Sequence, residues 1–144
     1  MTELKFSQLP FDIETINEIE NVRYHAYGIE NPPENSFYKI QLLERKYIAL
    51  GAYQNDQLIG GCYVSNSYQS LFIEQLFVLK NYQNSDLHIG TKLLQYVLEH
   101  KSWIEQHFNT KFNYSYLESR NPNSMLCENL GYHSGDSYIS KKRL

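Results

Sequence analysis

The sequence is poor in cysteine and has neither long hydrophobic runs nor an excess of positive charge. Its two cysteines, Cys62 and Cys127, do not have metal-ligand spacing, and the reducing compartment that we expect argues against a disulfide. No apolar run approaches the length of a bilayer span, and residues 1–5 lack the basic-then-apolar order of a signal peptide. We therefore expect a cytoplasmic protein with no membrane partner.

The net charge of the chain bears on which kinds of partner it can bind. The formal net charge is −3 at pH 7, and the basic cluster 141–143 is interpreted as a solvated chain end. A chain without net positive charge lacks the long-range attraction to phosphate backbones that nucleic-acid-binding proteins use. We therefore expect no nucleic-acid partner. No metal is expected either, because the histidines are scattered without ligand spacing: His25, His88, His100, His107 and His133.

The chain does have enough length and hydrophobic content for a core. It has 144 residues, of which 42% are hydrophobic and 20% are charged, which is typical of a globular domain. Its 13 tyrosines are many for this length, and most are expected at the edge of the core with hydrated hydroxyl groups. The sequence contains no repeats, linkers or low-complexity stretches. Residues 1–144 are therefore interpreted as a single domain.

Hydrophobic periodicity and turn residues predict alternating strands and helices. In the second predicted helix, Phe37, Ile40 and Leu43 are expected to face inward. Gly60-Gly61 is expected to permit close packing or a bulge within a strand. The element order is βααβββαβαβ, that of a mixed α/β domain. Strands are predicted at 4–6, 47–53, 58–65, 71–78, 111–118 and 137–142, helices at 13–22, 37–45, 91–100 and 124–129, and turns at 54–57 and 66–67.

The most informative segment joins the predicted strand 71–78 to the predicted helix 91–100. The connecting residues 83–91 are polar apart from Leu87 and Ile89. A short loop that leads into a helix presents unpaired backbone N–H groups at the positive end of the helix dipole. Such an arrangement binds phosphate, so the segment predicts a nucleotide-like ligand.

The same segment resembles the GNAT superfamily of acyl-CoA-dependent N-acyltransferases. Residues 76–78, followed by Tyr82-Gln83 and by 89–94, resemble the end of the family's central strand and its loop Gln/Arg-x-x-Gly-x-Gly/Ala, which surrounds the CoA pyrophosphate. Residues 121–132 resemble the family's closing segment. The resemblance covers nearly the whole chain. It implies a GNAT-like mixed, mostly antiparallel central sheet flanked by helices.

The resemblance also implies acetyl-CoA as the acyl donor. The loop departs from the family pattern, since it is longer between Gln83 and Gly90 and has His88 where the family has glycine. His88 then either contacts a phosphate or is a solvated loop residue, and Asn84 or Ser85 can add side-chain donors. The residues expected to bind the donor are Leu76, Phe77, Val78, Gln83, Asn84, Ser85, His88, Ile89, Gly90, Thr91 and Asn121.

Glu74 is the residue expected to remove a proton from the attacking amine, directly or through water. It interrupts an otherwise apolar strand face assigned to Phe72, Leu76 and Val78. Because burying a lone carboxylate is costly, Glu74 must be paired or open onto a cleft. Two alternatives stay open for Glu74, binding of the substrate ammonium group and a structural ion pair. The basic residues considered for that pair are Arg23, Lys92 and Arg120.

Cys127 stands where many family members have the tyrosine that protonates the departing CoA thiolate. A thiol can donate a proton, but Cys127 is equally interpreted as a small buried residue in a helix. The other candidate proton donors are Tyr116, Tyr132 and Tyr138. The resemblance further places the acceptor pocket near the end of the first helix, at Tyr24, Tyr27 and Glu30.

These observations favour an N-acetyltransferase that acts on the primary amine of a small molecule by direct attack in a ternary complex. Amino acids, polyamines and aminoglycoside-like amines are all open as acceptors, and Glu30, Glu74 and Glu118 favour a cationic one. Two alternatives are a protein or peptide N-acetyltransferase and a CoA-binding regulatory protein with little catalysis. The oligomeric state is open, with a homodimer among the options.

Overall fold

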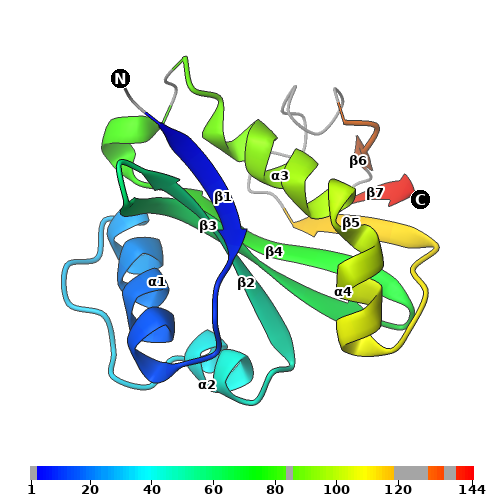
Figure 1. Ribbon diagram of the computed structural model, residues 1–144, viewed down its shortest axis with the longest axis horizontal. Coiled ribbons are helices and arrows are strands. Elements are labelled where there is room, and N and C mark those ends of the chain that lie inside the picture. The colour runs from blue at the N-terminus through cyan, green and yellow to red at the C-terminus, as the bar shows by residue number, and fades with distance from the viewer. Residues whose placement is uncertain (1–2, 84–85, 119–129, 135–138) are drawn as a thin grey trace.

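The computed structural model describes residues 3–83, 86–118, 130–134 and 139–144 (Figure 1). The described strands form a sheet in the order β1-β2-β3-β4-β5-β7-β6. Neighbouring strands are antiparallel except for β4 and β5, which are parallel. The predicted mixed, mostly antiparallel sheet is therefore confirmed. The strands are β1 (Leu4–Gln8), β2 (Tyr47–Gln54), β3 (Gln57–Ser67), β4 (Ser70–Val78), β5 (Tyr114–Glu118), β6 (His133–Ser134) and β7 (Ile139–Arg143).

Two side-chain caps set the starts of the first helices. The carboxylate of Asp12 accepts a hydrogen bond from the Thr15 N–H at 2.8 Å, and α1 (Ile13–Ala26) begins there. Ser36 Oγ accepts from the Lys39 N–H at 3.0 Å ahead of α2 (Phe37–Leu43). Both helices cover one face of the sheet, while α3 (Ile89–Glu99) and α4 (Lys101–Phe108) cover the other (Figure 1).

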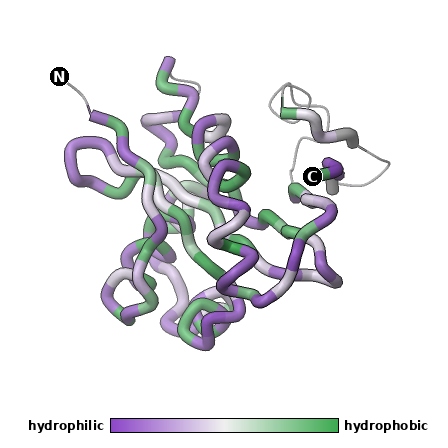
Figure 2. Tube along the Cα trace, turned by 45° about the vertical axis from the view of Figure 1, so that its right-hand side comes forward, coloured by the Kyte–Doolittle hydropathy of each residue, from purple (hydrophilic) through white to green (hydrophobic). Residues whose placement is uncertain are grey.

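Each pair of helices packs on its own hydrophobic cluster. On the α1–α2 side, Ile16, Ile19 and Leu42 are buried together with Phe77 of β4. On the α3–α4 side, a second cluster includes residues of both helices and of the central strands. Figure 2 shows hydrophobic stretches through the middle of the molecule and hydrophilic residues in many of the outer turns. The sheet is thus the middle layer of a helix–sheet–helix sandwich.

Several details of the predicted elements are wrong. Strand β6 was not predicted, the predicted strand 111–118 begins only at Tyr114, and the predicted helix 91–100 begins at Ile89. Helix α4 was not predicted either; it follows α3 after a change of backbone at His100 (ψ 21°), and its Ile104 is buried in the same cluster as Val97 of α3. The second predicted turn, at 66–67, lies instead at Tyr68 and Gln69, since β3 continues until Ser67 pairs with Ser70. Positive φ at two successive residues is the pattern of the tight hairpin turns that suit strand twist.

The orientation predicted for α2 is also wrong. Phe37, Ile40 and Leu43 are 60%, 45% and 42% exposed, whereas Leu42 is only 1% exposed. The buried side of this short helix carries Tyr38 and Leu42, which are four residues apart and therefore share a face. Tyr38 turns inward because its hydroxyl group has hydrogen-bond partners on β4.

A bulge in β4 changes which side chains share a face of the sheet. Gly61 pairs with Phe77 and Tyr63 with Glu74, so β4 has one more residue than β3 in this interval. Gln75 takes the extra place, in the left-handed region at φ 55°. Leu76 and Val78 consequently pack on the α3 side, while Phe77 lies on the α1 side with Glu74. The prediction that Glu74 shares a face with Leu76 and Val78 is therefore wrong.

The expectation of close packing at Gly60-Gly61 is confirmed. A Cβ atom at Gly60 would lie 2.7 Å from the carbonyl oxygen of Phe77. One at Gly61 would lie 2.7 Å from both Ile19 Cδ1 and the Leu50 carbonyl oxygen. These distances are shorter than a carbon atom tolerates, so glycine lets β3 lie close to β4 at Gly60 and close to α1 and β2 at Gly61.

Candidate active site

The bulged half of β4 borders two pockets. The first, here called the β4–α3 pocket, has a volume of about 470 Å³ and lies between the end of β4, the end of α1 and the start of α3. It brings Tyr27 together with several of the residues predicted to bind the donor. Its lining consists of Ala26, Tyr27, Leu76, Phe77, Val78, Lys80, Gln83 and Gly90.

Backbone donors are available at the β4–α3 pocket. Strand β5 pairs with β4 only from Ser70 to Ile73, and within the described residues no strand pairs with the remainder of β4 on that edge. At the start of α3, the first intrahelical bond runs from the Lys92 N–H to the His88 carbonyl at 3.0 Å. The N–H groups of Ile89, Gly90 and Thr91 therefore have no acceptor within the helix.

The loop before α3 has an unusual backbone at His88. This exposed residue precedes the helix with φ 51° and ψ 48°, the left-handed region that glycine enters without steric cost. His88, which stands where the family pattern has glycine, is thus in a left-handed conformation in this chain. The Ile89 side chain is buried in the core, which leaves only its backbone for a ligand. Gln83 Nε2 donates to the Val78 carbonyl at 2.7 Å and ties the loop to the end of β4.

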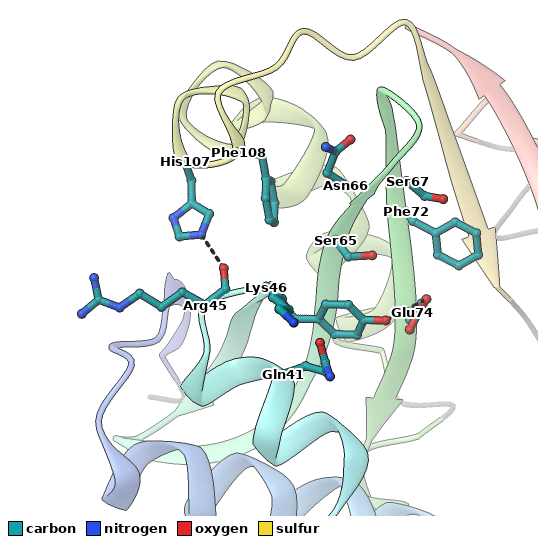
Figure 3. Close-up of a pocket in the computed structure, with 11 residues that line it drawn as sticks. Gln41, Arg45, Lys46, Ser65, Asn66, Ser67, Phe72, Glu74, His107 and Phe108 are labelled. Atoms are coloured by element: carbon teal, nitrogen blue, oxygen red, sulfur yellow. Dashed lines mark hydrogen bonds between the residues drawn. The ribbon is translucent and has the colours of Figure 1, made fainter.

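The second pocket, here called the Glu74 pocket, has a volume of about 600 Å³ and opens below the end of α4 (Figure 3). Glu74 comes from β4, Tyr47 from β2 and Gln41 from α2, so the pocket gathers elements that are far apart in the sequence. Its full lining is Gln41, Arg45, Lys46, Tyr47, Ser65, Asn66, Ser67, Phe72, Glu74, His107 and Phe108.

Two phenol groups hold the Glu74 carboxylate. Tyr38 donates to Oε2 at 3.0 Å and Tyr47 to Oε1 at 3.5 Å. Burial raises the pKa of Glu74 above its ordinary value and nearby Glu118 raises it further, while the two tyrosine donors oppose this rise. Among the described residues Glu74 forms no ion pair, and Arg23 bonds to Glu20 instead.

Both tyrosines keep their protons at neutral pH. Burial and the Glu74 charge raise the pKa of Tyr47 to about 12 and that of Tyr38 well above its usual range. They therefore act as hydrogen-bond donors to the carboxylate throughout the physiological range. Neither tyrosine was predicted as a site residue, because the abundance of tyrosine in the sequence does not distinguish these two from the others.

The other candidate residues are distributed as follows. Tyr24 packs on the Arg23 guanidinium, 4.4 Å from its ring centroid, and Glu30 is exposed; neither lines the two pockets. Tyr132 is fully buried, and its hydroxyl group bonds to Ser115 Oγ at 2.7 Å. Tyr116 stacks on Phe72 beside the Glu74 pocket. Four predicted site residues lie outside the described residues: Asn84, Ser85, Asn121 and Cys127. Arg120, Tyr138 and the predicted helix 124–129 lie outside them as well.

In the part of the chain that the structure describes, no group of three or more His, Cys, Asp or Glu side chains is placed to hold a metal ion. None of the described helices combines the length and apolar character needed to cross a membrane.

Comparison with known proteins identifies the relatives of this chain. The acetyltransferase (GNAT) family profile matches residues 13–125, while no curated protein gives a significant match. An acyl-CoA N-acyltransferase from Pseudomonas aeruginosa has a similar structure, with 11% identity, a TM-score of 0.70, and 96% of this chain and 97% of that chain covered. An aminoglycoside acetyltransferase from an uncultured soil sample gives 18% identity, a TM-score of 0.65, and coverage of 90% and 91%.

A third solved structure contains the cofactor. N-acetylglutamate synthase from Neisseria gonorrhoeae, complexed with coenzyme A and L-arginine, is 13% identical with a TM-score of 0.67, and the match covers 98% of this chain and 33% of that one. The structural likenesses show the fold, and the family profile covers most of the sequence. The chain therefore belongs to the GNAT acetyltransferase family, whose members use acyl-CoA, and is an acyltransferase.

Proposed function

We propose that the protein transfers an acetyl group from acetyl-CoA to the primary amine of a small molecule, by direct attack in a ternary complex. The observation that carries this proposal is the position of the bulged half of β4 between the two pockets. Leu76, Phe77 and Val78 line the β4–α3 pocket, and Glu74 lines the other. One strand can thus hold the acyl donor and deprotonate the acceptor.

The β4–α3 pocket fits the donor. The start of α3 offers the N–H groups of Ile89, Gly90 and Thr91 for a diphosphate, and Lys80 adds a positive charge. The unpaired edge of β4 offers backbone donors that can stabilise charge on a carbonyl oxygen. When bound, acetyl-CoA supplies an activated thioester. Asn84, Ser85 and Asn121 remain proposed contacts from the family pattern, as does Cys127 for protonation of the departing thiolate.

Glu74 is suited to remove the proton from the acceptor. Its raised pKa makes it a stronger base than an exposed carboxylate, and the donors Tyr38 and Tyr47 hold it in a fixed position. The proton of the attacking ammonium passes to Glu74 directly or through one water molecule. The free amine can then attack the thioester carbonyl, whose developing negative charge faces the β4 backbone.

The Glu74 pocket favours an amino-acid-like acceptor among the amines left open. Glu74 is the acidic residue in its described lining, and Arg45 and Lys46 line the edge of the same pocket, where the Arg45 guanidinium lies over the Phe11 ring and Lys46 Nζ is 3.2 Å from Glu44 Oε2. A polyamine or an aminoglycoside would bring several ammonium groups close to these cations. An amine that also carries a carboxylate would pair its ammonium group with Glu74 and its negative charge with the basic side.

The proposal is tested by an acceptor screen. The protein is incubated with acetyl-CoA and with amino acids, polyamines, aminoglycosides or short peptides, and both thiol release and the acetylated amine are measured. We expect turnover with at least one free amine, with amino acids the best class. Turnover with peptides alone would indicate a peptide acetyltransferase, and binding of acetyl-CoA without turnover would indicate a regulatory protein.

Gly90→Pro is predicted to weaken acetyl-CoA binding by about 10- to 100-fold, because it removes one N–H donor to a charged ligand. Proline is tolerated in the first turn of a helix, where the N–H has no internal acceptor, so the fold should survive. Calorimetric titration measures the affinity. Gly90→Ala keeps the N–H and is the matched control, expected to bind nearly as well. Equal affinity of the two variants would refute the assignment of the diphosphate to this helix start.

A further inference from the structure

A buried charge pair lies behind the Glu74 pocket, between α1, α2 and β3. Arg23 and Glu20 are only 7% and 5% exposed. Arg23 Nε donates to Glu20 Oε2 at 2.7 Å, and Nη2 donates to Oε1 at 3.1 Å. Ser36 and Tyr63 also donate hydrogen bonds to this carboxylate. Glu20 is therefore fully engaged, and the guanidinium group of Arg23 is fixed in orientation.

The remaining edge of that guanidinium group faces the bulge in β4. Arg23 Nη1 donates to Gln75 Oε1 at 3.3 Å, and the Tyr27 hydroxyl donates to the same oxygen at 3.0 Å. A guanidinium group has hydrogen-bond donors but no acceptor. The Gln75 atom that faces Arg23 must consequently be the carbonyl oxygen, and its amide nitrogen must point the other way, toward Tyr38.

The orientation of Gln75 determines the direction of the next hydrogen bonds. Gln75 Nε2 donates to Tyr38 Oη at 3.1 Å. Because an amide nitrogen only donates, Tyr38 accepts there and directs its own proton elsewhere. Its other partner is Glu74 Oε2, 3.0 Å away. Tyr38 thus donates to the carboxylate, in a direction that the Gln75 amide group fixes.

We propose that Arg23 and Gln75 are positioning residues for the acyl transfer, which orient the Tyr38 hydroxyl group as an obligatory donor to Glu74. The left-handed backbone at Gln75 fits this role, since it brings two successive side chains, Glu74 and Gln75, to the same side of the sheet. A strand without the bulge would direct them to opposite faces. The catalytic meaning of the arrangement rests on the proposed role of Glu74 as the base.

Other groups around Glu74 also influence its charge. Tyr47 of β2 is the second donor, Glu118 of β5 acts as a like charge, and Lys46 lines the same pocket. None of these changes when Gln75 is substituted. A test on Gln75 therefore isolates the direction of the Tyr38 hydrogen bond, provided that the effect of added charge is controlled separately.

The experiment is a double-mutant cycle read by ¹³C NMR titration of the Glu74 carboxyl group in the free protein. Gln75→Glu is nearly isosteric and places an acceptor where the amide donor was, so Tyr38 should turn its proton toward residue 75. In the wild-type background, Tyr38→Phe should raise the Glu74 pKa by about one unit, through loss of a donor to the charged form. In the Gln75→Glu background, Tyr38→Phe should change the Glu74 pKa by less than about a third of the shift that it causes in the wild-type background.

Gln41→Glu is the matched control for charge, because it adds one negative charge to the lining of the Glu74 pocket at a residue outside the described hydrogen bonds that link Arg23, Gln75, Tyr38 and Glu74. In that background Tyr38→Phe should keep its full effect. An equal effect in all backgrounds would overturn the proposal, since Tyr38 would then donate to Glu74 whatever residue 75 is. Should Gln75→Glu fail to fold, Gln75→Leu replaces it: an unchanged Glu74 pKa in that variant would also overturn the proposal. The titration needs no turnover, so it separates this inference from failure of the proposed function.

Discussion

Glu74→Gln is expected to lower kcat for amine acetylation by about 100-fold, the scale of general-base catalysis, while leaving acetyl-CoA affinity unchanged. Glutamine keeps the shape of the side chain, and its single carbonyl oxygen can still accept a hydrogen bond from one of the two tyrosines, but it cannot take a proton. The loss should shrink as pH rises, because more of the amine is then already free. The measurement is a pH–rate profile of both enzymes, with acetyl-CoA affinity determined separately by calorimetry.

The wild-type profile should itself carry the signature of Glu74. Since its folded-state pKa is raised, activity should fall as pH drops through a value above that of an ordinary glutamate, where the base becomes protonated. Glu118→Gln is the matched control, because it removes the like charge and so should move this acid limb to lower pH with little change on the plateau. A loss in Glu74→Gln that is equal at every pH, or an increase in the amine KM alone, would instead make Glu74 a substrate-binding residue.

Arg23→Met is expected to lower the free energy of unfolding by about 3–5 kcal/mol, the usual effect of removing one partner of a buried ion pair. Methionine fills most of the space of the arginine stem, so the loss comes mainly from the Glu20 carboxylate. That group would stay buried with hydrogen bonds from Ser36 and Tyr63 but without a positive charge beside it. Urea unfolding at neutral pH measures the change.

The pH dependence of this loss has a defined sign. In the wild type, burial raises the pKa of Glu20. The hydrogen bonds and the charge of Arg23 lower it, and their effect is larger, so the pKa is below its ordinary value. Its stabilising contribution is present above the unfolded pKa and is lost as pH falls through the folded one. Without Arg23, burial should raise that pKa, so the destabilisation should diminish on acidification as Glu20 becomes protonated. The difference between variant and wild type should therefore be smaller at pH 5 than at pH 7.

The double variant Glu20→Met, Arg23→Met is the control for this interpretation. It removes both charges together and should recover part of the stability that Arg23→Met loses. If the double variant is no more stable than Arg23→Met, the arginine contributes through packing on the rings of Tyr24 and Tyr38 rather than through its charge. A destabilisation of Arg23→Met that does not change with pH would lead to the same conclusion, that Arg23 contributes through packing rather than through its charge.

Features that depend on neighbouring residues were predicted correctly from the sequence. The start of α1, the positions of β2, β3 and β4 and the polar loop before α3 follow from local preferences of the backbone and from hydrophobic periodicity. A carboxylate in an apolar strand was expected to be either paired or open onto a cleft, and Glu74 lines a pocket. The GNAT family followed from motifs that lie within single stretches of chain.

The environment of Glu74 was decided by the tertiary structure alone. Arg23 meets Gln75 across 52 residues of sequence, and Tyr38 meets Glu74 across 36. No local rule predicts the bulge at Gln75, because a left-handed backbone at glutamine is unfavourable by itself and is held by those distant partners. The same contacts turn Tyr38 of α2 inward and leave Phe37 outside, against the apolar pattern of the helix. The sequence by itself thus determined the family, most of the elements and the candidate base, whereas long-range hydrogen bonds decided how that base is held.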